Sequence, residues 1–216
     1  MKLLAALLLL TGFWSVGTCA ETNRAASDAP EINFRSARLD LVLESYAGCS
    51  GRTLLVHPLL PAMTITLRAT ATNNAECAKV LAAAFATNGI AVIADGDKFV
   101  LVVPKNYVRF VHPRATEVKA GASSAEDPAA ITAHGIILTG ADCASVAGTY
   151  ASLVGRKLNR TNWAPGVAQR FFFFNNQTAL SKSELIYALE TLFEWSGLKL
   201  VPDGEKFLKP VPFTPK

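Results

Sequence analysis

The chain has 216 residues and a formal net charge of +4 at pH 7, from 21 basic and 17 acidic residues. This excess is too small and too evenly spread to predict binding to nucleic acid or to an anionic membrane surface. Half of the residues are hydrophobic, and the length allows one large domain or two small ones.

The N-terminus has the pattern of an export signal. Lys2 precedes the apolar run from Leu3 to Leu10, and small residues ending at Ala20 suit cleavage by signal peptidase. The run is shorter than the roughly 20 apolar residues that a spanning helix needs. Residues 1–20 are therefore predicted to direct the chain to the periplasm, and the polar residues 21–30 to form a flexible leader. A second interpretation makes Cys19 a lipid-anchored lipoprotein terminus.

A strand and a helix open the first folded unit. Apolar and polar residues alternate from Glu31 to Ala37, which predicts a short strand. Gly51 then marks the end of a helix. The residues before it form one apolar stripe at helical spacing, namely Leu39, Val42, Leu43, Tyr46 and Ala47.

Two more strands, a second helix and a hairpin complete this unit. Residues 53–56 and 63–68 are rich in strand-forming types and flank a proline turn. Asn73 and Glu76 have the spacing of a helix capping box, and an apolar hairpin at residues 91–103 follows the helix. The predicted order is β-α-β-β-α-β-β, in which a small sheet packs on two helices.

The same unit occurs twice. Residues 197–212 match residues 89–104 at seven of sixteen positions, and residues 136–165 match residues 32–61 at nine of thirty. Chance identity is only about 6% per position, so the matches indicate a duplication. We predict an α+β protein of two tandem two-layer modules, residues 31–104 and 136–212. Residues 105–135 are predicted to be a flexible linker, and residues 213–216 a tail.

Several segments of the first module carry a family resemblance. They are the strand INFRSA from Ile32, a helix ending in Ser50-Gly51, the strand MTITL from Met63, and a second helix ending in Asn88-Gly89. This arrangement resembles the N-terminal periplasmic domains of secretins and the related short N-terminal domain of TonB-dependent receptors. Such modules stack as rings in the periplasmic vestibule of type II and type III secretion channels and pilus secretins. Because no long β-rich pore segment follows, the chain is not expected to form the channel itself.

The resemblance implies a non-enzymatic protein that binds other proteins in the periplasm. It would be a component or accessory of a type II secretion or pilus-type assembly, with a secretin or related subunit as its partner, or with a second copy of itself. One alternative is a signalling module of the TonB-receptor kind that binds an inner-membrane regulator. Another is an enzyme of unrecognised type, which would gather His57, His112 or His134 with acidic residues in a deep pocket. No cofactor, metal or small-molecule substrate is expected, since the sequence has none of the usual motifs.

The cysteines allow two interpretations. Cys49 and Cys77 correspond to Leu153 and Leu185 in the other module, so both are core positions. They are either buried thiols or a disulfide that ties the end of the first helix to the start of the second in an oxidising compartment.

The least ordinary stretch is a run of four phenylalanines, Phe171, Phe172, Phe173 and Phe174. On a strand they place two rings on each face of a sheet. Either the other module or the linker covers the second face, or the face is an exposed strip for self-association or a partner. The hairpin containing Phe99 and Leu101 is a further candidate interface. The later hairpin instead carries Lys209 and Pro210, which are typical of a blunted edge strand.

Overall fold

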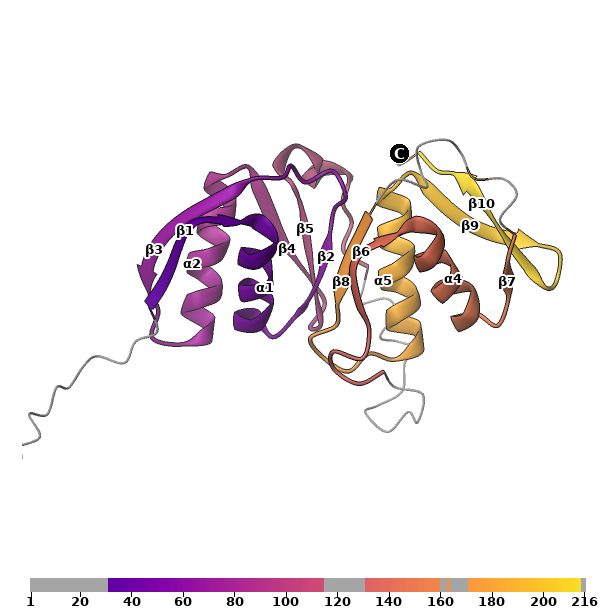
Figure 1. The fold of residues 1–216 in the computed structure, drawn as a ribbon, viewed down its shortest axis with the longest axis horizontal. Coiled ribbons are helices and arrows are strands. Elements are labelled where there is room, and N and C mark those ends of the chain that lie inside the picture. Colours follow the sequence, from indigo (N-terminus) through magenta and orange to yellow (C-terminus); the bar gives the residue numbers. More distant parts are fainter. Residues whose placement is uncertain (1–30, 115–130, 160–162, 164–170, 215–216) are drawn as a thin grey trace, which may run out of the picture.

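The computed structural model describes residues 31–114, 131–159, 163 and 171–214. The predicted signal peptide, the alternative lipid anchor and the leader lie outside these residues. Within them, the predicted order of elements is confirmed in both modules (Figure 1). Module 1 consists of β1 (Glu31–Arg38), α1 (Leu39–Ser50), β2 (Thr53–Val56), β3 (Thr64–Thr70), α2 (Asn74–Thr87), β4 (Ile90–Asp95) and β5 (Phe99–Pro104).

Module 2 repeats this order. Its elements are β6 (Ile137–Asp142), α4 (Cys143–Leu153), β7 (Lys157–Leu158), β8 (Phe171–Asn175), α5 (Lys182–Trp195), β9 (Leu198–Asp203) and β10 (Phe207–Pro212). The ends of the predicted linker belong to the fold, because η1 (Lys105–Phe110) is a 3₁₀ helix and Ile131 pairs with Leu180.

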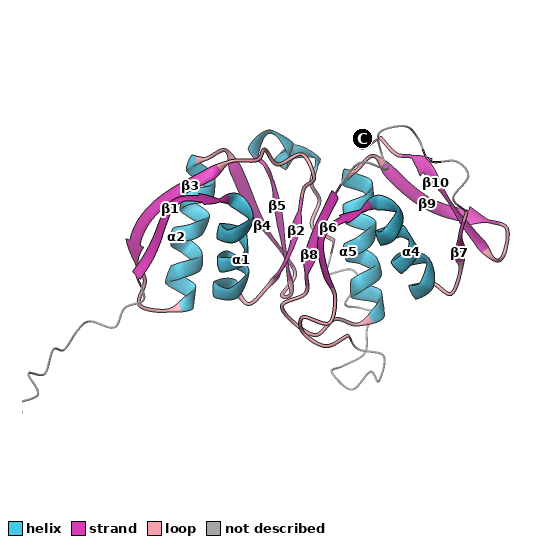
Figure 2. Cartoon of the chain, viewed as in Figure 1, coloured by secondary structure: helices cyan, strands magenta, loops and turns pink. Residues whose placement is uncertain are grey.

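The strands of each module form two small sheets, and the two helices lie between them (Figure 2). In module 1, β1 pairs with β3, while β2, β5 and β4 form a mixed sheet in that order. In module 2, β6 pairs with β8, and β7, β10 and β9 repeat the mixed sheet. The sequence predicts a single sheet per module, since alternation indicates the faces of a strand but not its partner.

Local hydrogen bonds explain where the long helices begin. At α2, the Asn73 side chain accepts the Glu76 N–H at 2.9 Å. At α5, Ser181 and Glu184 form a complete capping box, in which each side chain accepts the other's backbone N–H. Both caps stand where the sequence predicts them.

A disulfide joins the two helices of module 1. Cys49, near the end of α1, is bonded to Cys77 in the first turn of α2, and their Cα atoms lie 5.9 Å apart. Cys143 is fully buried in α4. The bond lies at the margin of the module 1 core, which α1 and α2 build with the inner faces of both sheets.

The core of module 2 extends across the boundary between the modules. Val100 and Val102 of β5 point into module 1, whereas Phe99 and Leu101 join the core of module 2. The middle strand is therefore buried on both faces, which explains its uninterrupted apolar sequence from Phe99 to Val103. Figure 1 shows the β2-β5-β4 sheet between the helices of module 1 and α5, with β8 beside β2.

Polar contacts also cross this boundary. The Tyr187 hydroxyl donates to the buried carboxylate of Asp95, and the Lys98 ammonium donates to Glu184 at 2.8 Å. Burial, then the hydrogen bond to Asp95, raise the pKa of Tyr187 well above its ordinary value of about 10. Because the folded-state pKa is raised, the stabilisation from this group is complete below about pH 10 and is lost as the pH rises further.

Tyr187→Phe should therefore destabilise the chain at neutral pH by about 1–3 kcal/mol, since Asp95 loses a buried donor. The variant should also lose less stability than the wild type between about pH 9 and pH 11. Urea unfolding at several pH values measures both effects. Tyr150→Phe is the control, because Tyr150 bonds Glu190 within module 2. A Tyr187→Phe variant as stable as the wild type would argue against the contact.

Candidate functional site

The four phenylalanines of β8 alternate between the core and the surface. Phe172 and Phe174 are 1% and 3% exposed, and both belong to the core of module 2. Phe171 and Phe173 are 59% and 45% exposed. Both interpretations of the run therefore hold in part: one pair of rings is covered within the chain, and the other pair faces outward.

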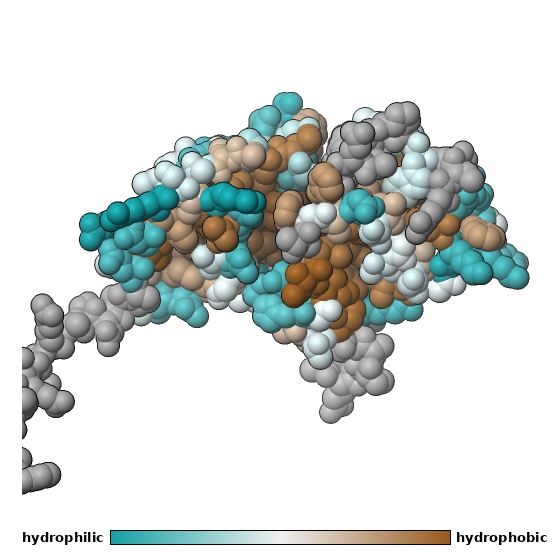
Figure 3. Space-filling model, viewed as in Figure 1, coloured by the Kyte–Doolittle hydropathy of each residue, from teal (hydrophilic) through white to brown (hydrophobic). Residues whose placement is uncertain are grey.

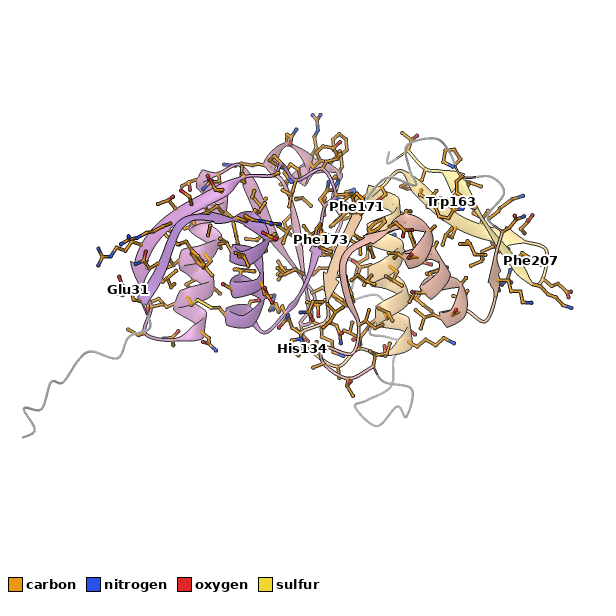
Figure 4. The ribbon with its side chains drawn as sticks, in the orientation of Figure 1. Glu31, His134, Trp163, Phe171, Phe173 and Phe207 are labelled. Carbon is orange, nitrogen blue, oxygen red and sulfur yellow. A yellow bond between two sulfur atoms is a disulfide. The ribbon has the colours of Figure 1, made fainter. Side chains whose placement is uncertain are left out.

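The neighbouring strand extends this apolar surface. In the antiparallel register of β6 and β8, Thr139 lies opposite Phe173 and Ile137 opposite Asn175. Residues two apart on a strand share a face, so Ile137 lies on the same side as Phe173, and it is 60% exposed. We call Ile137, Phe171 and Phe173 the outer face of β6-β8. Figure 4 labels its two phenylalanines near the centre of the molecule, and Figure 3 shows hydrophobic atoms gathered near the middle of this view.

Polar groups border the outer face at both ends. Asp142, opposite Phe171, accepts hydrogen bonds from the backbone N–H and the hydroxyl of Ser145, which hold the pKa of its carboxyl below the usual range. At the other end, the Asn175 side chain contacts His134 Nδ1 at 3.0 Å. An apolar centre within a polar rim is the common anatomy of a protein–protein interface.

Module 1 provides an internal comparison for this face. Its β1-β3 pair has the same register and the same irregularity, with Ala37 opposite Ile65 where Ala141 lies opposite Phe172. The positions of Ile137, Phe171 and Phe173 are occupied there by Asn33, Thr64 and Thr66, all exposed. The fold therefore forms equally well with a polar outer face, and the apolar residues of module 2 serve something other than folding.

The second candidate interface is not at the surface. Phe99 and Leu101 are each 1% exposed, and the Phe99 ring packs edge-on against Tyr187 of α5. Both side chains are covered by module 2, so in this arrangement neither is accessible to a partner. Lys209 forms an ion pair with Asp203 at 3.2 Å, and Pro210 is buried.

Two of the three histidines meet at a cavity of about 530 Å³ between the modules. His57 and His112 line it together with Glu194, whereas His134 lies at the rim of the outer face. His57 is buried between the rings of Tyr107 and Trp195, and its Nδ1 accepts the backbone N–H of Leu59. Glu194 is paired with Arg114 at 3.0 Å. The cavity therefore unites the residue types that an enzyme would need, but His57 and Glu194 already have structural partners.

Sequence reasoning missed Ile137 and the cavity. Ile137 could have been found by comparing it with Asn33 in the other module. The cavity could not, because its walls come from distant segments that only packing brings together. Among the described residues, no cluster of three or more His, Cys, Asp or Glu could hold a metal ion. No helix in the described ranges is long and apolar enough to cross a bilayer.

No family model matches the chain, and no curated protein matches it. Among solved structures, the chain is similar to one described as "Structure of XcpQN012", a set of secretin N-terminal domains. The two are 12% identical, the match covers 80% of this chain and 70% of that one, and the TM-score is 0.31.

Proposed function

We propose that this chain is an exported, non-enzymatic protein that binds a protein partner in the cell envelope through the outer face of β6-β8. It acts as a component or accessory of a type II secretion or pilus-type assembly, and its partner is a secretin or a related subunit. The observation that carries the proposal is the replacement of Asn33, Thr64 and Thr66 of module 1 by Ile137, Phe171 and Phe173.

The energetics favour a covered face. Each of these three side chains leaves about half of its surface in water, so its burial by a partner contributes about 1–1.5 kcal/mol. Phenylalanine side chains lose little conformational entropy on binding because they have only two rotatable bonds. Three such residues side by side within a polar rim form a compact anchor.

The location and the assembly are supported by other features. The Cys49–Cys77 disulfide fits an oxidising compartment outside the cytoplasm. The assembly itself is inferred from the sequence resemblance to secretin N-terminal domains, together with the β-α-β-β-α-β-β order found in both modules. The two modules pack through Phe99 and Leu101, which leaves the outer face of module 2 for a partner.

The triple variant Ile137→Asn, Phe171→Thr and Phe173→Thr tests the proposal, because it gives module 2 the residues of module 1. Its free energy of unfolding should stay within about 1 kcal/mol of the wild type, since all three side chains are exposed. Its affinity for the partner should fall roughly a hundredfold, which corresponds to the lost apolar contact. The measurement is a pull-down from envelope extract with tagged full-length chain, with partners identified by mass spectrometry.

Phe207→Thr is the matched control, because Phe207 is also exposed but lies on β10, away from the outer face. A secretin or pilus subunit that binds the wild type and Phe207→Thr but not the triple variant supports the proposal. Capture of an inner-membrane regulator instead would favour the TonB-receptor-like alternative. Equal capture by all three chains would show that the outer face is not the binding site.

A further inference from the structure

The cavity between the modules has the size and the walls of a ligand site. Its volume of about 530 Å³ lies within the usual range for small-molecule pockets, roughly 300–1,000 Å³. The walls come from both modules and from the segment between them. They include Leu101 of β5, Tyr107 and Phe110 of η1, Trp195 of α5, and Phe213 after β10.

The polar groups among these walls already have partners within the chain. His57 Nδ1 accepts the Leu59 N–H, the Thr191 hydroxyl donates to the Tyr187 carbonyl, and the Tyr187 hydroxyl donates to Asp95. The interior therefore offers ring faces and apolar contact. That environment suits an aromatic or acyl body rather than a sugar or a nucleotide base.

The charge around the cavity is predominantly positive. The segment from Lys105 to Arg114 has three basic residues and no acidic one. The Arg109 guanidinium lies over the ring of Phe110, a wall residue, at 4.6 Å from its centroid. Arg114 lies over the Tyr187 ring and pairs with Glu194, the only acidic residue among the described walls. One positive charge thus remains in excess, which attracts an anionic group.

We propose that this cavity binds an amphiphilic anion, with its aromatic or acyl body between Tyr107, Phe110 and Trp195 and its anionic head near Arg109 and Arg114. The proposal rests on the cavity alone and is independent of the outer face of β6-β8. The same chemistry occurs in free aromatic acids and in fatty acids, so the test must distinguish the two.

Anilinonaphthalene sulfonate is a suitable probe, since it combines an aromatic body with an anionic head and fluoresces in apolar surroundings. It is titrated into the full-length chain that carries Phe171→Thr and Phe173→Thr, which removes the other exposed aromatic surface. We expect saturable binding of one probe per chain. Displacement by oleate would identify an acyl body, and displacement by naphthoate an aromatic one. Neutral naphthol should compete at least tenfold more weakly than naphthoate.

Two variants of this chain localise the probe. Arg109→Gln with Arg114→Gln should weaken binding roughly tenfold by removing the positive charge, whereas Lys199→Gln on β9 should not. Leu59→Trp, a change at an exposed wall residue, should reduce binding by occupying the cavity. Urea unfolding verifies that each variant is folded. The proposal is overturned if the probe does not saturate, if neither cavity variant weakens it, or if naphthol competes as well as naphthoate.

Discussion

Replacing Phe172 with alanine is expected to lower the free energy of unfolding by about 3–5 kcal/mol, because the change removes a fully buried ring and leaves a cavity. Phe172 is 1% exposed, and its ring meets that of Phe193 edge-on with centroids 5.9 Å apart. Its neighbour Phe173 is 45% exposed on the opposite face of the same strand. Phe173→Ala should therefore cost about 1 kcal/mol or less.

The comparison is stringent because the two residues are chemically identical and adjacent. Urea unfolding followed by circular dichroism gives both free energies under one set of conditions. Similar losses for the two variants would mean that Phe173 is also buried, in which case the outer face of β6-β8 would not be available to a partner. Loss from Phe173→Ala alone would indicate the opposite strand register, since a shift of one residue exchanges the two faces.

Loss of the Cys49–Cys77 disulfide is expected to have the next largest effect. The bond joins residues 28 positions apart, and closing such a loop stabilises a folded chain by about 3–4 kcal/mol in the chain-entropy model. The double variant Cys49→Ala and Cys77→Ala should therefore unfold at a much lower urea concentration than the wild type.

Reduction separates the bond from the side chains. Dithiothreitol should destabilise the wild type by nearly as much as the double substitution does, and it should leave the double variant unchanged. Mass spectrometry of non-reduced peptides should recover the Cys49 and Cys77 peptides as one linked species. Alkylation of both cysteines in the folded, untreated protein would contradict the assignment.

The order of the elements could be predicted from the sequence because the chain contains its own second example. Each module repeats the helix caps, the apolar stripes and the glycine stops, so an error in one module is exposed by the other. Asn73 and Ser181 both cap a helix as their spacing predicts. These are local features, determined by residues within one or two turns of each other.

The packing of the modules could not be predicted in the same way. Phe99 and Phe207 occupy matching positions of the two hairpins, yet Phe99 is 1% exposed and Phe207 is 43% exposed. The difference arises because α5 covers the hairpin of module 1 from outside. Alternation along a strand shows that it has two faces, but only tertiary structure determines what lies against each one.

The candidate site lies between these extremes. The phenylalanine run drew attention to β8 because it breaks the expected alternation of residue types. Which pair of rings faces outward depends on the register with β6, and that register places Phe172 opposite Ala141. Ile137 shows no unusual feature in its own sequence context and becomes informative only beside Asn33 of module 1.

Cross-linking from the outer face tests the central claim most directly. A photoreactive benzoylphenylalanine replaces Phe173 in the full-length chain, expressed in the cells that naturally produce it, and a second chain carries the same group at Thr66, the matching exposed position of module 1. We predict that position 173 cross-links to a secretin or pilus subunit and that position 66 does not. Cross-links from neither position, from both equally, or from position 173 only to a second copy of the chain would contradict the account.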